Sequence, residues 1–417
     1  MITISPATQK MLALSMLSGV GPATLRRVVS HSLESAPIIE LSRRIPAIAK
    51  AIAVPSAWEL AQELAQKQCD AAEKADAYII SALDEGYPTL LSATKDDPYI
   101  LFVKGTLFQT PEKSVAIIGT RQPTKHGEMI TRRITDFFCG QHWSIVSGLA
   151  LGCDGIAHRA AIEAGGHTVA VLAHGLQTVA PSQHRKLAEE ILNSGGALVS
   201  EYRFGQGALP TQFVKRDRTQ AGLSQGVVMI QSDLKGGSLH ASRAALDYER
   251  WLAVPYPTAA DAQANESKIQ ANLMIANSGS DIDRANLLKC HISRLSKVIV
   301  LRAKGDYPQL VSAPVGVLED SAAEIALDGD EGREQAFLLP QGDDLPESSP
   351  DELYVLVAPA EEILRDQSDS QNKDDGKRSE PESPEHQGET PEVSSDPRKL
   401  DITPESRADL TVQQKLL

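Results

Sequence analysis

Short apolar runs recur from residue 99 to residue 301, and helical stretches separate them. The intervening segments, such as GEMITRRITDFF and SLHASRAALDYER, have an apolar and a polar face when they are wound as helices. Near-continuous apolar strands that alternate with such helices are typical of βαβ units. The sequence therefore predicts the α/β class, with an extended Rossmann-like parallel sheet. The runs are Tyr99–Lys104, Val115–Ile118, Trp143–Val146, Thr168–Leu172, Ala197–Val199, Gly226–Ile230, Trp251–Val254 and Val298–Leu301.

The 417 residues are enough for more than one domain. The residue composition and the pattern of apolar residues change twice along the chain. Residues 1–75 predict a small helical domain of the helix-hairpin-helix or SAM-like kind, and residues 76–317 predict the Rossmann-like domain. In residues 7–34, two helical patterns flank Gly19-Val20-Gly21. The amides of such a hairpin can face a DNA phosphate. A helical domain whose tight turn touches no DNA is an equally open interpretation.

Residues 318–417 read as an acidic, largely disordered tail. From Leu318 onward the chain has 9 Lys and Arg against 27 Asp and Glu, which leaves 32 against 28 for residues 1–317. The overall net charge of −14 therefore hides a mildly basic body, and anion binding stays open. The tail is poor in aromatic residues and rich in Ser, Pro, Glu and Asp, so we expect disorder from about residue 366 and one short element at 352–364.

The composition also indicates where in the cell the protein is expected. No apolar stretch reaches the eighteen or more residues of a membrane helix, so no membrane span is expected. The start, MITISPATQK, lacks the charged-then-apolar order of a signal peptide. The 4 cysteines have no CxxC spacing, which suggests neither a disulfide framework nor a zinc site. We expect a cytoplasmic protein.

Two of the predicted strands end in small polar loops. The first loop is Gly119-Thr120-Arg121, and the second begins at Ser147-Gly148 and continues through Gly152 to a helix. Ligands of open parallel sheets lie at the carboxyl ends of the strands. Glycines let backbone amides approach an anion, the following helix adds a partial positive charge, and an arginine can grip phosphate oxygens. The loops therefore predict a phosphate site, although neither is the GxGxxG fingerprint or a P-loop.

A third stretch, PTQFVKRDRTQAG, combines cations with an aromatic ring. Charges for the backbone and a ring for a base suit a single nucleic-acid strand, whereas a solvated helix face is the alternative. The residues are Phe213, Lys215, Arg216 and Arg218.

Several motifs in series make the sequence similar to the DNA-processing protein A (Smf) family. They are YPTLL and DDPYILFVKG, VAIIGTRQPTKHG, IVSGLALGCDGIAHRAAIEAGGHTVAVLAHGL, ALVSEY, FVKRDRTQAGLS and GGSLHASRAALDYERWLAVP, with GVGPATLRR near the start. The resemblance covers roughly residues 7–280. It implies a non-catalytic protein that binds single-stranded DNA, forms a homodimer and loads a RecA-type recombinase during natural transformation. It requires no cofactor, metal or ATP hydrolysis.

Residue by residue, the resemblance assigns a phosphate pocket to the two strand-end loops and an extension of it to the third stretch. The pocket residues are Gly119, Thr120, Arg121, Ser147, Gly148 and Gly152, and the extension is Phe213, Lys215, Arg216 and Arg218. The chain departs from the family in three respects. Asp217 stands where the family usually has Asn between two arginines, and Gln220 stands where a small apolar residue is usual. No winged-helix domain is recognisable in the acidic tail.

Other functions remain open on the sequence alone. The same fold superfamily includes phosphoribohydrolases with a PGGxGTxxE motif, but KGGSLHASRA, residues 235–244, has no carboxylate to act as acid or base. Ser147, Asp154 and His158 resemble a hydrolase set without a GxSxG elbow, and a capping role for His158 is favoured. Cys153 and His158 are too few ligands for a metal. A nucleotide-binding sensor would need the same phosphate loops.

Overall fold

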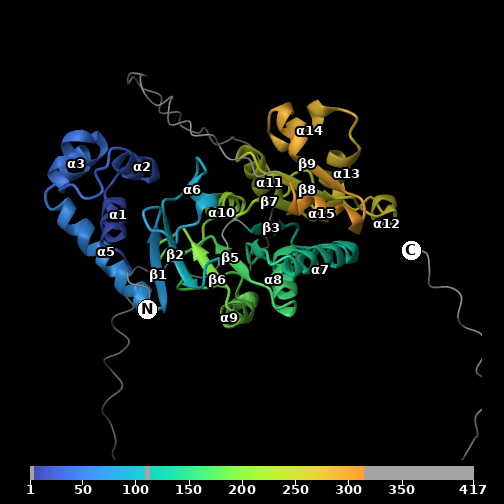
Figure 1. The fold of residues 1–417 in the computed structure, drawn as a ribbon, viewed down its shortest axis with the longest axis horizontal. Helices are drawn as coiled ribbons and strands as arrows, with labels where there is room; N and C mark the ends of the chain where they lie inside the picture. Colours follow the sequence, from blue (N-terminus) through green and yellow to red (C-terminus); the bar gives the residue numbers. More distant parts are fainter. Residues whose placement is uncertain (1–3, 109–112, 314–417) are drawn as a thin grey trace, which may run out of the picture. The chain divides into compact units, whose positions relative to one another are not determined.

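The computed structural model describes residues 4–108 and 113–313, and a nine-stranded sheet runs through this part of the chain (Figure 1). Its strand order is β1-β2-β6-β5-β4-β3-β7-β8-β9. All neighbours from β6 to β9 in this order are parallel, whereas β1 pairs with β2, and β2 with β6, in antiparallel fashion. The predicted α/β fold with an extended Rossmann-like sheet is confirmed. The strands are β1 (Ala77–Ser81), β2 (Ile100–Gly105), β3 (Ser114–Ile118), β4 (Ser144–Ser147), β5 (Thr168–Leu172), β6 (Ala197–Ser200), β7 (Gly226–Met229), β8 (Trp251–Pro255) and β9 (Val298–Leu301).

The central strands are apolar throughout because both faces of the sheet are covered. In β3 all residues are buried, with Val115 and Ile117 in one hydrophobic cluster and Ala116 and Ile118 in another. This two-residue alternation is the pleat of a strand packed on both sides. The exception to the predicted pattern is β1, which carries AYIIS at the edge and was not among the predicted runs.

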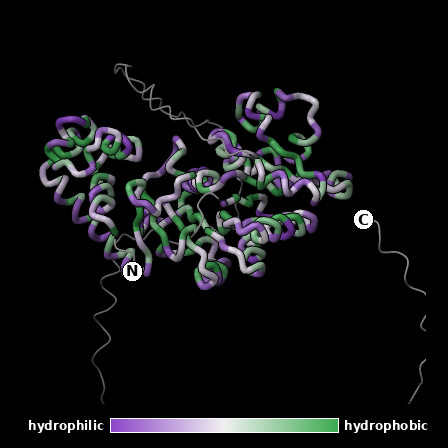
Figure 2. Tube along the Cα trace, viewed as in Figure 1, coloured by the Kyte–Doolittle hydropathy of each residue, from purple (hydrophilic) through white to green (hydrophobic). Residues whose placement is uncertain are grey.

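Two helical layers cover the sheet. Helices α7 (Lys125–Gly140), α8 (Cys153–Glu163) and α9 (Arg185–Asn193) lie on one face, and α10 (Pro210–Gly222), α11 (Ser238–Asp247) and α13 (Gln270–Asn277) lie on the other (Figure 1). In Figure 2 hydrophobic and hydrophilic residues alternate along these helices, as expected for helices that bury one side. The remaining helices of the α/β part are α6 (Thr89–Ser92), α12 (Ala259–Gln263), α14 (Asp281–Leu288) and α15 (Pro308–Val311).

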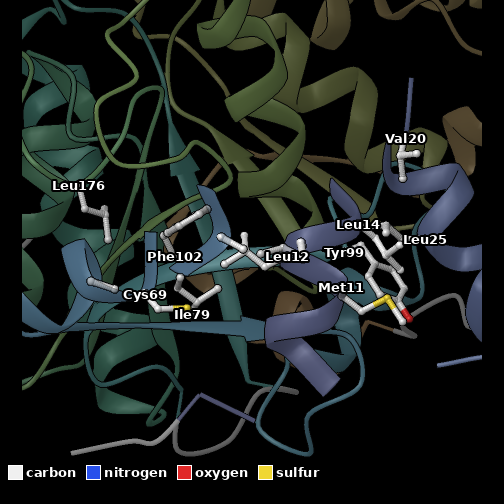
Figure 3. Close-up of a cluster of buried hydrophobic side chains, with 14 of the residues drawn as sticks. Met11, Leu12, Leu14, Val20, Leu25, Cys69, Ile79, Tyr99, Phe102 and Leu176 are labelled. Atoms are coloured by element: carbon white, nitrogen blue, oxygen red, sulfur yellow. The ribbon is translucent and has the colours of Figure 1, made fainter. Parts of the chain in front are cut away.

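A set of helices precedes the sheet, as predicted. Helices α1 and α2 flank a turn in which Gly19 has a φ of +75°, and the Ser5 side chain caps α1 by accepting from the Thr8 amide. Their apolar side chains form one cluster with Phe102 and other strand residues (Figure 3). Full burial of a side chain such as Phe102 contributes about 1.5–3 kcal/mol. The helices are α1 (Pro6–Met16), α2 (Pro22–Ser30), α3 (Ile38–Arg44), α4 (Pro46–Ile52) and α5 (Ala57–Lys74).

The chain divides into two units, Met1–Asp343 and Asp344–Leu417, and every described residue belongs to the first. The domain boundary predicted near residue 75 stays a prediction. The acidic tail predicted for residues 318–417, including its possible element at 352–364, lies outside the described residues. Within the described part of the chain, no helix combines the length and the apolar character needed to cross a membrane.

Candidate functional site

The predicted phosphate loops lie where the strand order reverses. Successive strands are added on one side of β3 as β4, β5 and β6, and on its other side as β7, β8 and β9. In open α/β sheets such a reversal leaves a crevice at the carboxyl ends of the strands. Here the Thr120 amide, just after β3, donates to the carbonyl of Gln231, just after β7, at 2.9 Å. The chain therefore has its candidate site at the sheet edge that the sequence indicated.

The β3 loop passes very close to the start of α8. A Cβ added at Gly119 would lie 2.6 Å from the Cys153 Sγ, so only glycine fits there without displacing that thiol. The side chain of Arg121 is exposed, and the Thr120 hydroxyl accepts from the Gln122 amide at 3.2 Å. Thr124 then caps α7 by accepting from the Gly127 amide at 3.2 Å. Arg121 is thus an exposed cation on a loop that is closely held at both ends.

The β4 loop lies directly against the β3 loop. Gly152 has a φ of +76°, and a Cβ there would lie 2.4 Å from the Thr120 carbonyl oxygen. The Cys153 amide at the start of α8 donates to that same oxygen at 3.2 Å. These contacts make the two glycine loops neighbours, and their joint binding of a phosphate stays a prediction.

The interior of the β4 loop holds a carboxylate of the protein itself. The buried Asp154 Oδ2 accepts from the amides of Gly148 at 3.1 Å and Ala150 at 3.3 Å. Burial raises the pKa of Asp154, and the charge of Arg216 opposes that rise. The Gly148 amide is therefore already engaged, which differs from the expectation that it would face a phosphate. An Asp in the first turn after a glycine loop was the signal for this, because such a carboxylate readily binds nearby amides.

Arg216 lies beneath the loop and not along an open surface. Its side chain is 7% exposed; its Nη1 donates to the carbonyls of Gly148 and, at 3.0 Å, Val171, and its Nε donates to Asp217 at 3.1 Å. These bonds cross-link the ends of β4 and β5 to α10. A buried guanidinium needs such partners because an unpaired buried charge is costly. The expected role of Arg216 in extending a groove stays a prediction, whereas its bracing contacts are a feature that the sequence did not reveal.

The predicted cation cluster is split between two faces of α10. Phe213 lies 5.8 Å from the Arg216 guanidinium, on the side of the β4 loop. Lys215 is exposed, and Arg218 pairs with Asp96 at 3.1 Å on the other side of the helix. Residues that adjoin in sequence on a helix point in different directions, since each step rotates the chain by about 100°. The side chains of the stretch KRDR therefore do not form one continuous surface.

Asp217 connects α10 electrostatically with the β3 loop. Burial raises its pKa to about 6, the charges of Arg216 and Arg121 oppose this rise, and that of Asp154 adds to it. Arg121 therefore lies within electrostatic range of the α10 cluster, as a continuous cradle requires. Asp217 also accepts from the Gln220 side chain at 3.0 Å, so both departures from the usual family pattern are in contact.

The hydrolase set considered as an alternative is not complete, because His158 bonds elsewhere. The Ser147 hydroxyl is buried and donates to the Ile117 carbonyl at 2.7 Å, between β3 and β4. The Nδ1 of His158 pairs with the Thr168 hydroxyl at 2.7 Å, and burial lowers the His158 pKa to about 3. His158 therefore does not bond to the glycine loop, contrary to the capping role expected for it. Instead, the His184 Nδ1 bonds to the Leu149 carbonyl of that loop at 2.7 Å.

Two further alternatives, the phosphoribohydrolase and the metal site, have little support in the geometry. The first turn of α11, which follows Gly236 and Gly237, contains no acidic residue that could serve a phosphoribohydrolase. Among residues 4–108 and 113–313, no three His, Cys, Asp or Glu side chains are grouped closely enough to hold a metal ion.

Gln231 is a site residue that sequence reasoning missed. Its Oε1 accepts from the Thr124 amide, and its Nε2 donates to the Thr124 hydroxyl, both at 2.9 Å. A Cβ at Gly127 would lie 2.3 Å from the Gln231 Oε1. This amide therefore fixes the start of α7 against the end of β7. A polar residue directly after the apolar run GVVMI was the only available signal.

A family model described as DNA recombination-mediator protein A matches residues 78–285, which include all but the first residue of β1, the strands β2 to β8 and every site residue above. Through this region the chain belongs to that family. The match begins in β1, after the helices α1 to α5, and ends in α14.

Individual relatives agree with the family. Protein Smf of Escherichia coli (strain K12) is 39% identical over 186 residues, covering 44% of this chain and 50% of that protein. DNA processing protein DprA of Bacillus subtilis (strain 168) is 37% identical over 171 residues, covering 40% of this chain and 57% of that protein. The chain thus matches about half the length of these curated relatives. The X-ray structure of DNA processing protein A from Streptococcus pneumoniae shares the fold, with a TM-score of 0.55 and 23% identity over 74% of this chain and 98% of that one.

Proposed function

We propose that this chain binds single-stranded DNA without sequence preference, as part of DNA processing, and that it acts as a binding protein and not as an enzyme. The observation that carries the proposal is the meeting of the Gly119–Arg121 loop, the Gly148–Gly152 loop and α10 at one sheet edge. Exposed Arg121 supplies charge for a phosphate there, and the partly exposed ring of Phe213 can stack on a base. Lys215 adds an exposed cation on α10. The family name refers to DNA recombination and the name of a relative to DNA processing, and both agree with an activity on DNA.

The proposal also includes the partners, the oligomeric state and the location of the protein. Protection of the strand, its transfer to a RecA-type recombinase during DNA uptake and a homodimeric state follow from the family resemblance. A cytoplasmic location is the expectation from the sequence composition. None of these needs a cofactor, a metal or ATP hydrolysis. Purified RecA-type recombinase added to DNA-bound protein tests the transfer step, and light scattering tests the dimer.

Removal of two exposed cations tests DNA binding directly. Arg121→Ala with Lys215→Ala should weaken binding to an oligothymidylate at least tenfold at low salt, because each side chain is solvent-exposed and can neutralise a phosphate. The dependence of log affinity on log salt should become shallower by about 1.4, from about 0.7 for each lost phosphate contact. Fluorescence anisotropy across a salt series measures both quantities.

A matched control separates this effect from net charge. Arg132→Ala with Lys67→Ala also removes two exposed cations, but these lie beside Glu163 and Glu63, on α7 and α5. We expect this control to bind like the wild type. Equal affinities of the two double variants would contradict the proposed site. Tight binding of a mononucleotide without strand binding would favour the nucleotide sensor, and turnover of that mononucleotide would favour the enzyme.

A further inference from the structure

A second, separate pocket lies at the ends of β8 and β9. It is a cavity of about 160 Å³ at the same edge of the sheet as the glycine loops, on the far side of β7 from them. One wall is α7, and the others are the segments that follow β8 and β9. It is lined by His126, Ile130, Arg133, Pro255, Tyr256, Leu301, Arg302, Ala303, Lys304 and Tyr307.

The lining is positively charged. The side chains of Arg133, Arg302 and Lys304 are exposed, and within the described residues no carboxylate lies within ion-pairing distance of any of them. The nearest acidic group in sequence, Asp306, is occupied, since its Oδ2 accepts from the amides of Arg302 at 2.7 Å and Ala303 at 2.9 Å. Three cations therefore face a cavity that has no acidic side chain in its lining.

The other titratable groups around the pocket do not change its net positive charge. His126 lies with its Nδ1 3.8 Å from Asp261, and burial lowers its pKa while Asp261 raises it and Arg133 lowers it. Burial raises the pKa of Tyr307, so its hydroxyl stays protonated. At neutral pH the ring of His126 and the phenol of Tyr307 are therefore neutral hydrogen-bonding groups. Two acidic residues contact the lining from outside it: Asp306, through the amides of Arg302 and Ala303, and Asp261, through His126.

An aromatic ring holds one of the three cations in place. The Arg302 guanidinium lies 4.5 Å from the centre of the Tyr256 ring, a cation–π contact that limits its freedom. Tyr307 is 3% exposed, and its ring packs edge-on against Phe137 at 5.6 Å. A guanidinium fixed in this way loses less conformational entropy when it binds an anion.

Shared residues connect the pocket with the glycine loops. Gln231 bonds to Thr120 on one side, and on the other it lines a small recess with His126 and Tyr256, which also line the pocket. Neighbouring strands are about 4.8 Å apart, so the three steps from β3 through β7 and β8 to β9 span about 14 Å. A single strand that starts at Arg121 reaches that far within a few nucleotides.

We propose that this pocket is a second phosphate-binding subsite, which takes the sugar-phosphate backbone of the DNA strand held at the glycine loops. This inference rests on the proposed function. The guanidinium groups of Arg133 and Arg302 and the ammonium group of Lys304 bind the non-bridging oxygens of a phosphodiester. The volume of about 160 Å³ is below the roughly 300 Å³ at which small-molecule pockets begin. It therefore suits a backbone segment and not a complete free nucleotide.

The test compares two variants that lose the same charge. Arg302→Gln with Lys304→Gln removes two subsite cations, and Lys67→Gln with Lys74→Gln removes two exposed cations from α5, at a distance from the sheet edge. We expect the subsite variant to bind a 20-nucleotide oligothymidylate at least fivefold more weakly at low salt, with a salt slope shallower by about 1.4. The control should match the wild type. Replacement of the DNA phosphates by neutral methylphosphonates should abolish the difference between the two variants.

Each outcome has a distinct meaning. If the subsite variant matches the control while Arg121→Ala with Lys215→Ala weakens binding, the proposed function stands and the subsite is rejected. If the wild type binds no oligonucleotide, the proposed function itself fails, and the strand subsite fails with it. Loss of binding of free dTMP in the subsite variant, with strand affinity unchanged, would identify a nucleotide site and overturn the proposal. Arg133→Gln, with Arg132→Gln as its neighbour control, repeats the test on α7 should the first variant fold poorly.

Discussion

Gly148 occupies the narrow space between the buried side chains of Asp154, in α8, and Arg216, in α10. A Cβ at this position would lie 2.1 Å from the Arg216 Nη1 and 2.7 Å from the Asp154 Oδ2. The Gly148 amide donates to that carboxylate, and its carbonyl accepts from that guanidinium. The residue is therefore a small link between opposite charges that are shielded from water. Its backbone geometry decides where the ends of β4 and α10 lie.

We expect Gly148→Ala to destabilise the protein and to weaken DNA binding together. The added methyl group must push apart the charged pair, and overpacking of this kind costs about 1–3 kcal/mol in the free energy of unfolding. Chemical denaturation measures it. The control is Gly140→Ala at the end of α7, where a Cβ meets no atom within 4 Å. There the free energy of unfolding should stay equal or rise by up to about 1 kcal/mol. Equal stability of both variants would contradict the tight contact at Gly148.

At the scale of elements, strands were easier to predict than the orientation of a helix. The run SVAII is buried on both faces, and its apolar character alone indicated the central strand β3. The edge strand β1 was missed because only part of it is buried, and its sequence AYIIS runs on from the end of α5. The strand-end position of Arg121 followed from this alternation, since parallel strands share their carboxyl edge.

Helix α10 shows what the sequence could not reveal. The stretch FVKRDR places Lys215 and Arg216 side by side in the sequence, yet one is exposed and the other is buried. The rotation of a helix is set by its tertiary contacts, here the bonds from Arg216 to carbonyls at the ends of β4 and β5. Such long-range contacts carry no local signal. The occupation of the β4 loop by Asp154 is a contact of the same kind.

The carboxylate on α10 predicts a pH dependence. The folded-state pKa of Asp217, about 6, is above the usual value of 3.8. Ionisation of Asp217 therefore opposes folding. Its contribution to the free energy of unfolding falls as pH rises from about 4 through about 6. Above about pH 6 the charge also repels DNA phosphates near Arg121. Asp217→Asn should thus tighten strand binding at pH 7.5 by roughly threefold to tenfold, as expected for one nearby like charge.

A pH series separates this effect from other titrations. At pH 5 the wild type is largely protonated at Asp217, so its affinity should approach that of the Asn variant, which keeps an oxygen to accept from Arg216 and Gln220. Asp70→Asn, on exposed α5, removes one negative charge elsewhere and serves as the control. A constant ratio between wild type and Asp217→Asn from pH 5 to pH 7.5 would contradict a role for this carboxylate in binding.

At the scale of the whole molecule, positive groups gather along one edge of the sheet. Arg121 follows β3 and Arg302 follows β9, and both side chains are exposed. From β3 to β9 there are three steps between neighbouring strands, or about 14 Å. The edge is thus long enough for several linked nucleotides, and the body of residues 1–317 is mildly basic with 32 Lys and Arg against 28 Asp and Glu. The remaining 100 residues carry the opposite sign.

The charge contrast between body and tail predicts electrostatic competition with DNA. From Leu318 the sequence has 27 acidic against 9 basic residues, and so dense a negative charge competes with phosphates for the same cations at low ionic strength. Truncation after Val317 should therefore tighten strand binding near 10 mM salt, where charges act over about 30 Å, and have little effect near 1 M, where they act over about 3 Å. A chain whose tail is replaced by an uncharged Ser/Gln sequence of equal length should bind like the truncated protein. If this neutral tail restores the weaker binding, the tail acts through its bulk, and if truncation changes nothing at low salt, the tail does not compete at all.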